Sequence, residues 1–233
     1  PSNAGTINVE SNKSAGIFAK ITDAVTRNIE NTGTIKLGGT AKTESVGMYA
    51  EIGSTATGTT TLDNKNQITV EQEKSVGMFV KNGTNDRTKG KALNNATTGK
   101  IDLNVKETVG IYAYNAEGVN DNVINVTKEN SAGMYGSTDS HITNNKEINV
   151  SHENSAGMYA LDSNATNAAT GTITLTGSAT ATSGSAGMYG KLTSNVTKVD
   201  YTILNQGQIQ LTSVTKNVGI YGTTEVNVTK ILT

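Results

Sequence analysis

Short runs of alternating apolar and polar residues recur along the chain and predict β-strands. One run has the form Gly-x-Ile-x-Val/Leu and occurs as GTINV at 5–9, GTIKL at 33–37, GKIDL at 99–103, GTITL at 171–175 and GQIQL at 207–211. Weaker copies are NQITV at 66–70, NVINV at 122–126 and KEINV at 146–150. A period of two in β-branched residues, bounded by Gly, Asn and Ser, is typical of pleated strands.

A second apolar run follows each copy of the first. Its versions are SAGIFA, SVGMYA, SVGMFV, TVGIYA, SAGMYG, SAGMYA, SAGMYG and NVGIYG, whose glycines are Gly16, Gly47, Gly77, Gly110, Gly133, Gly157, Gly187 and Gly219. A unit of 23 to 33 residues with two or three short strands cannot bury its own apolar face, so it must stack on similar units. The repeat predicts an all-β fold: a single-stranded, right-handed parallel β-helix of about eight coils, one solenoid spanning residues 1–233.

Stacking places equivalent residues of successive coils in columns. All five methionines occupy one position of the second run, so we expect them to face inward together with the isoleucines at that position. Strand alternation then puts the following residue on the outer face. Eight of the ten aromatic residues stand there: Phe18, Tyr49, Phe79, Tyr112, Tyr135, Tyr159, Tyr189 and Tyr221. We expect this aromatic ladder to form a surface stripe; a bulge at the glycine would instead reverse the two faces.

Three further columns have structural interpretations. The glycine of the second run requires either positive φ or close approach of a neighbouring backbone. The hydroxyl column two residues earlier should satisfy turn amides; it contains Ser14, Ser45, Ser75, Thr108, Ser131, Ser155 and Ser185, with Asn217 departing. An asparagine column precedes the first run and predicts an amide ladder; it contains Asn3, Asn31, Asn64, Asn120, Asn144 and Asn205, with Thr97 and Ala169 departing.

The composition favours a narrow interior. Only 34% of the residues are hydrophobic and 4% aromatic, with one proline and no tryptophan or cysteine. A net charge of −1 argues against nucleic acid as a partner. No apolar run is long enough to span a membrane. The absence of cysteine excludes disulfides and thiolate metal sites. Residues 1–4 do not begin a signal peptide, so we expect a cut or processed N-terminus.

No arrangement of residues predicts catalysis, a metal or another cofactor. Ser185 lies in GSAG, which is not a nucleophile motif, and His141 and His152 have no carboxylate cluster beside them. Glycoside hydrolysis needs two carboxylates on one face, but the candidates share no register and are interpreted as surface charge. They are Asp63, Asp102, Asp121 and Asp139.

One charged insertion is the best candidate for a specific contact. Residues 81–91 read KNGTNDRTKGK and are expected to form a solvated loop. The cations of this possible contact loop are Lys81, Arg87, Lys89 and Lys91.

Across all eight coils, the pairing of Asn-x-Gly-x-Ile-x-Val/Leu with Ser-Ala/Val-Gly-Met/Ile-Tyr/Phe resembles the passenger domains of large autotransporter (type V secreted) adhesins of fusobacteria and related Gram-negative bacteria. The resemblance implies an excised segment of an exported protein at the cell surface, anchored in the outer membrane by a barrel outside this segment. It also implies attachment to a protein or glycan on host cells or other bacteria. It identifies no binding residues, because the matching motifs are the scaffold.

Three functions remain open at this point. The favoured hypothesis is a non-catalytic adhesin segment, monomeric as a fragment, that binds through its lateral face and inserted loops. A passive stalk that spaces a distal binding tip fits a regular stack nearly as well. A glycan-cleaving β-helix enzyme is the third.

Overall fold

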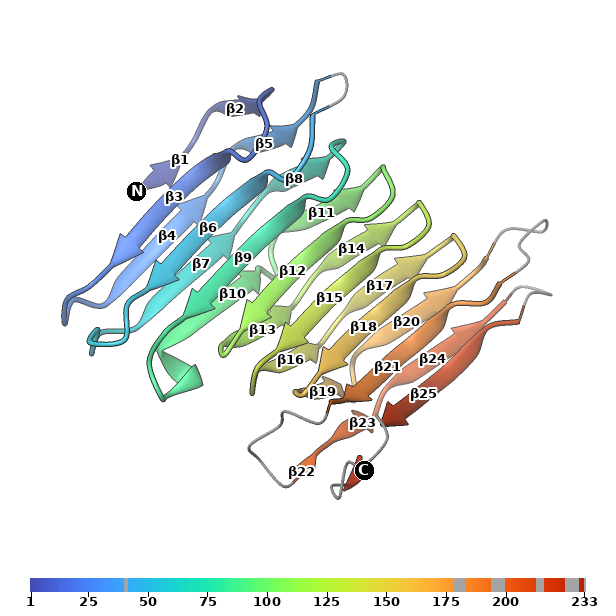
Figure 1. Cartoon of the computed structure of the whole chain (residues 1–233). Coiled ribbons are helices and arrows are strands. Elements are labelled where there is room, and N and C mark those ends of the chain that lie inside the picture. Colours follow the sequence, from blue (N-terminus) through green and yellow to red (C-terminus); the bar gives the residue numbers. More distant parts are fainter. Residues whose placement is uncertain (40–41, 178–182, 194–199, 213–215, 225–230, 233) are drawn as a thin grey trace.

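The computed structural model describes all residues except 40–41, 178–182, 194–199, 213–215, 225–230 and 233. Three parallel sheets of eight strands run through it, and each coil of the chain contributes one strand to each sheet (Figure 1). The predicted all-β parallel β-helix of about eight coils is confirmed. None of the described residues belongs to a helix that could cross a membrane.

The strands repeat in the order sheet A, sheet B, sheet C. Sheet A contains β1 (Ser2–Asn3), β4 (Arg27–Asn31), β7 (Thr60–Asn64), β10 (Gly90–Asn94), β13 (Glu117–Asn120), β16 (His141–Asn144), β19 (Asn164–Asn167) and β23 (Ile203–Asn205). Sheet B contains β2 (Thr6–Val9), β5 (Thr34–Leu37), β8 (Gln67–Val70), β11 (Lys100–Leu103), β14 (Val123–Val126), β17 (Glu147–Val150), β20 (Thr172–Leu175) and β24 (Gln208–Leu211). Sheet C contains β3 (Ala15–Ile21), β6 (Val46–Ile52), β9 (Val76–Asn82), β12 (Val109–Tyr114), β15 (Ala132–Ser137), β18 (Ala156–Leu161), β21 (Ala186–Leu192) and β25 (Val218–Thr224).

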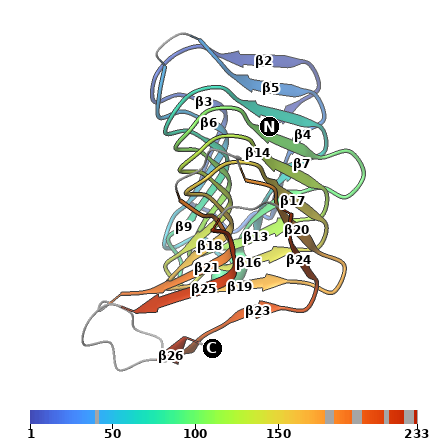
Figure 2. The ribbon, with the colours of Figure 1, turned by 90° about the vertical axis from the view of Figure 1, so that its right-hand side faces the viewer.

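Three small elements lie outside this pattern. A 3-10 turn, η1 (Arg87–Lys89), precedes β10, and β22 (Asp200–Tyr201) pairs with β26 (Ile231–Leu232). Strand β26 lies beside the C-terminus (Figure 2).

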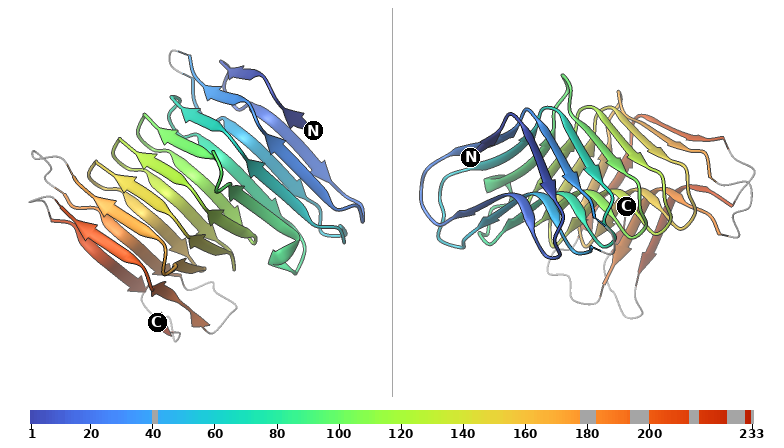
Figure 3. Two further views of the ribbon diagram at one scale, coloured as in Figure 1. Left: turned by 180° about the vertical axis from the view of Figure 1, so that it is seen from behind. Right: turned by 90° about the horizontal axis from the view of Figure 1, so that it is seen from above.

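Like residues lie above like residues along the stack. Ile101 pairs with Ile68 on one side and Ile124 on the other, and the same registration holds throughout sheet B. Successive coils follow one another from the N-terminal to the C-terminal end (Figure 3). Seven steps at a strand spacing of about 4.8 Å give a stack roughly 34 Å long.

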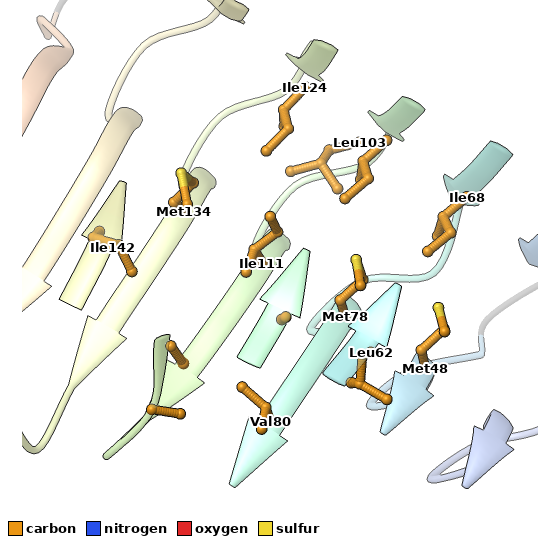
Figure 4. Close-up of a cluster of buried hydrophobic side chains, with 14 of the residues drawn as sticks. Met48, Leu62, Ile68, Met78, Val80, Leu103, Ile111, Ile124, Met134 and Ile142 are labelled. Atoms are coloured by element: carbon orange, nitrogen blue, oxygen red, sulfur yellow. The ribbon is translucent and has the colours of Figure 1, made fainter. Parts of the chain in front are cut away.

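Sheets A, B and C enclose a narrow apolar core (Figure 4). All five methionines are fully buried, which confirms that their column faces inward; they are Met48, Met78, Met134, Met158 and Met188. The equivalent Ile220 lies in β25, the edge strand of sheet C, and is 48% exposed. The interior is filled mainly by isoleucine, methionine, leucine, valine and alanine, in agreement with the composition.

The glycine column exists because neighbouring backbones approach closely. None of its members has positive φ, since Gly39 and Gly177 are the only described glycines that do. In the middle coils glycine and the following residue both face inward, as at Gly110 and Ile111, so the regular alternation is interrupted there. A Cβ on Gly110 would lie 2.5 Å from the carbonyl oxygen of Gly133 in the next coil. Any larger residue would therefore push two coils apart.

A continuous asparagine ladder fills the corner between sheets A and B. In each step a side-chain Nδ2 donates to the Oδ1 of the next coil over 2.7–2.9 Å; the members are Asn3, Asn31, Asn64, Asn94, Asn120, Asn144, Asn167 and Asn205. The predicted departures at Thr97 and Ala169 are wrong, because Asn94 and Asn167 hold those two places. The turns that follow are longer in these coils, so counting back from the glycine missed the amides.

The hydroxyl column satisfies backbone amides between sheets B and C, as predicted. The amide of Ser45 donates to Ser75 Oγ over 3.0 Å, and that of Ser131 to Ser155 Oγ over 3.2 Å. Asn217 departs in residue type only, since its Oδ1 accepts from the amide of Ser185 over 2.9 Å. The backbone amides of this column are therefore paired coil by coil.

A methyl group on the glycine column should destabilise the stack. For Gly110→Ala we expect a loss of about 2–3 kcal/mol in the free energy of unfolding, because the added Cβ overlaps the Gly133 carbonyl. Gly219→Ala is the matched control, since the nearest atom to its Cβ lies 3.9 Å away. Urea unfolding followed by far-ultraviolet circular dichroism measures both; equal stabilities would contradict the close-approach explanation.

Removing an amide from the middle of the asparagine ladder should cost more than removing one at its end. Asn120→Ala breaks the links to Asn94 and Asn144 and leaves the buried Asn144 Oδ1 without its donor, so we expect a loss of about 2–4 kcal/mol. Asn3→Ala breaks one ladder link and should cost about half as much. Urea midpoints that fall equally would show that the ladder bonds are not the cause.

Candidate functional site

The aromatic ladder lies on the outer face of sheet C. Neighbouring ring centroids are 4.5–5.4 Å apart along the whole stack. Phe18 and Tyr221, at the two ends, are 53% and 52% exposed, and the six rings between them are half-buried. The outward orientation expected from the sequence is therefore confirmed; a contact role for the ladder stays a prediction.

An open groove of about 710 Å³ runs beside the ladder across the last five coils of sheet C. Its floor consists of Val109, Ala132, Ala156, Ala186 and Val218. One wall consists of Tyr135, Tyr159, Tyr189 and Tyr221. The other wall is formed by the turns that enter sheet C, with Glu107, Thr108, Asn130, Ser131, Asn154, Ser155, Gly184, Ser185 and Lys216. We call this feature the tyrosine groove.

The depth of the tyrosine groove comes from its three alanines. Alanine occupies the floor position in coils five to seven, whereas Val46, Val76, Val109 and Val218 hold the same register position in the coils on either side. Three successive alanines between Val109 and Val218 leave a hollow, which larger valine side chains would fill.

The two largest tilts between successive rings of the ladder lie along the groove. Tyr49, Phe79 and Tyr112 stack within 9° of parallel. From Tyr112 to Tyr189 the successive rings are tilted by 40°, 52° and 62°. The separation is not complete, since Phe18 and Tyr49 outside it are tilted by 42°, and Tyr189 and Tyr221 in its wall stack within 8° of parallel. Tilted rings cover less of one another's faces, so part of each aromatic face is available to the groove.

The phenol groups of the groove are available for hydrogen bonding. Tyr112, just outside it, bonds through its hydroxyl to Ser137 Oγ at 3.1 Å. Within the described residues the hydroxyls of Tyr135, Tyr159 and Tyr189 have no such partner. Burial, reinforced by the neighbouring phenols, raises the pKa of Tyr135 far above its usual range, and burial also raises the pKa of Tyr159. Both phenols are therefore neutral donors over a wide pH range.

The predicted contact loop is shorter than expected, and its four cations lie in three different elements. Lys81 belongs to β9 and lies 3.4 Å from Glu51, while Lys91 belongs to β10 in sheet A. Arg87 and Lys89 lie in η1, whose N-cap Asp86 accepts a hydrogen bond from the amide of Thr88. The four cations are thus divided between two sheets and the turn that joins them, because strand pairing extends into both ends of the insertion. Their contact role stays a prediction.

The two histidines lie apart. His141 in β16 lies 3.1 Å from Thr166 Oγ1 through its Nε2, and burial lowers its pKa. His152 follows β17 and faces Glu129 at 3.8 Å. No group of three His, Asp or Glu side chains suited to a metal ion occurs in the part of the chain that the structure describes.

The acidic residues weighed for hydrolysis are separated as well. Asp63 lies in sheet A with Lys65 3.5 Å away, and Asp102 lies in sheet B with Lys100 at 2.9 Å. Asp121 accepts a hydrogen bond from Asn145 over 2.6 Å in the turn between these sheets.

No family model, curated protein sequence or solved structure matches this chain. The candidate site therefore rests on geometry alone. Sequence reasoning identified the aromatic ladder but missed the groove beside it. The available signal was the change from S-V-G to S-A-G in three consecutive coils, with tyrosine after each methionine.

The raised pKa of Tyr135 predicts a loss of stability at high pH. The folded state keeps this phenol protonated, whereas the unfolded state ionises it near pH 10.0, so the stabilisation is complete below that pH and is lost as pH rises further. Tyr135→Phe keeps the ring and should make the decline above pH 10 less steep, with little change in stability at pH 7. Urea midpoints between pH 7 and pH 11 test this; identical slopes would contradict it.

Proposed function

We propose that this chain is a non-catalytic segment of an extended cell-surface adhesin, which attaches to host or bacterial surfaces through its lateral face. The observation that carries the proposal is the tyrosine groove: an open, aromatic-walled hollow on the side of a rod. Concave sites lined by apolar and aromatic groups with a few polar ones are the usual form of ligand sites.

The repeat motifs support a more specific assignment. Their resemblance to autotransporter passenger domains favours an exported protein held at the outer membrane, of which this chain is one part. A cysteine-free chain suits passage through an oxidising periplasm, where disulfides form readily. A rod built by stacking coils also displays its lateral surface over a long distance.

The stalk remains the second candidate, and one observation favours it. The outer faces of the first coils carry ordinary surface ion pairs such as Lys36–Glu71 at 2.9 Å and Lys13–Glu44 at 3.4 Å. Such exposed pairs contribute little and indicate a solvated surface. A spacer would need nothing more than this regular stack.

Attachment can be measured with the full chain. Beads coated with residues 1–233 should adhere saturably to cultured epithelial cells or to other bacteria, and soluble chain should compete. Beads coated with an unrelated protein of similar charge serve as the control. Adhesion no greater than this control on every surface would favour the stalk, and release of reducing ends from polysaccharides would favour the enzyme.

A further inference from the structure

The tyrosine groove has a distribution of charge that selects its ligand. Among the described residues that line it, Glu107 and Lys216 alone are charged, and they lie in the first and last of its five coils with opposite signs. Between them the floor is aliphatic and the walls carry phenol, amide and hydroxyl groups. A polyanion or a polycation would find no complementary field along this length, so the groove suits a neutral ligand.

The backbone beneath the three alanines of the floor is not available for pairing, because β15, β18 and β21 are interior strands of sheet C. The amides of Ala132, Ala156 and Ala186 donate to carbonyls of the preceding coil over 2.9–3.0 Å. Strand β15 is also paired on both sides, with β12 and β18. An extended peptide carries a donor and an acceptor at almost every residue, and such peptides are usually bound by main-chain pairing at a free strand edge. A peptide lying on the alanine floor would find no main-chain partner there.

An acyl chain also fits poorly. It would use the aliphatic floor but would cover the half-buried Tyr135, Tyr159 and Tyr189 without offering their hydroxyls a hydrogen bond. Desolvating polar groups without replacing their hydrogen bonds costs free energy. The ligand must therefore combine apolar faces with polar edges.

We propose that the tyrosine groove binds a neutral linear glycan whose chain runs parallel to the axis of the stack. This proposal rests on the adhesin function and names its ligand class. Sugar rings present C–H faces to the alanine floor and the tilted tyrosine rings, and their hydroxyl edges reach the phenols on one wall and Asn130 and Asn154 on the other. Repeated sugar units meet repeated coils at a spacing of about 4.8 Å, over roughly 19 Å.

The chain itself supplies the variants that test the groove. The triple variant Ala132→Val, Ala156→Val, Ala186→Val fills the floor with the residue found at the same register position in four other coils. Ala15→Val makes the same change in the first coil, outside the groove, and is the matched control. Tyr159→Phe removes one hydroxyl and keeps a ring type that Phe18 and Phe79 already place in the ladder.

Binding is measured on immobilised neutral cello-, chito- and manno-oligosaccharides, with sialylated and sulfated glycans beside them. We expect the wild-type chain and Ala15→Val to bind at least one neutral linear glycan equally, and the triple variant to bind it at least about tenfold more weakly. Tyr159→Phe should weaken binding by several-fold, with unchanged circular dichroism. Equal binding by the triple variant, binding to anionic glycans alone, or binding to no glycan would overturn the proposal.

Cell adhesion separates this proposal from the function on which it rests. If wild-type beads adhere and mild periodate oxidation of the cell-surface glycans abolishes adhesion, the glycan proposal is supported. If adhesion survives periodate and is lost after protease treatment, the partner is a protein: the adhesin function stands and the glycan proposal fails. If the wild-type chain adheres to no surface and binds no glycan, both proposals fail.

Discussion

Every coil of this protein is hydrogen-bonded in register to the coils above and below it, and this single constraint determines the rest of the structure. At a strand spacing of about 4.8 Å, equivalent side chains of neighbouring coils are in contact, so each buried column must keep a similar size and chemistry. The glycine column is the strictest case, since a Cβ on Gly47 would lie 2.6 Å from the Gly77 carbonyl oxygen. The repetition of the sequence is the direct consequence of this packing.

Polar columns allow the stack to close around a small apolar core. The asparagine ladder and the hydroxyl column bury amides and hydroxyls at two corners, where they bond to adjacent coils, as Asn31 does to Asn64 and Ser45 to Ser75. Buried polar groups are stable only when they are paired in this way. Turns can lengthen without disturbing the columns, as Asn94 shows, because the strand and not the turn holds each ladder residue in place.

The outer face of sheet C is under weaker constraint, and it is there that the coils differ. The inward columns maintain the fold, so the floor position can alternate between valine and alanine without breaking a ladder. In coils five to seven this freedom produces a hollow beside tyrosines whose hydroxyls are not used by the fold. A lateral binding site can thus arise on a repetitive rod by the loss of a few methyl groups.

The sequence by itself determined the architecture, the inward methionines and the outward aromatic ladder, because residues in like columns must be alike and the alternation of a strand assigns the faces. It did not reveal Asn94 and Asn167 as ladder members, since turn lengths shift their sequence spacing but not their place in the corner. It also did not show that Lys81 and Lys91 lie in separate sheets. The tyrosine groove was decided only by the tertiary structure. Its floor and its two walls come from five coils, and these residues form a hollow only once the coils are stacked.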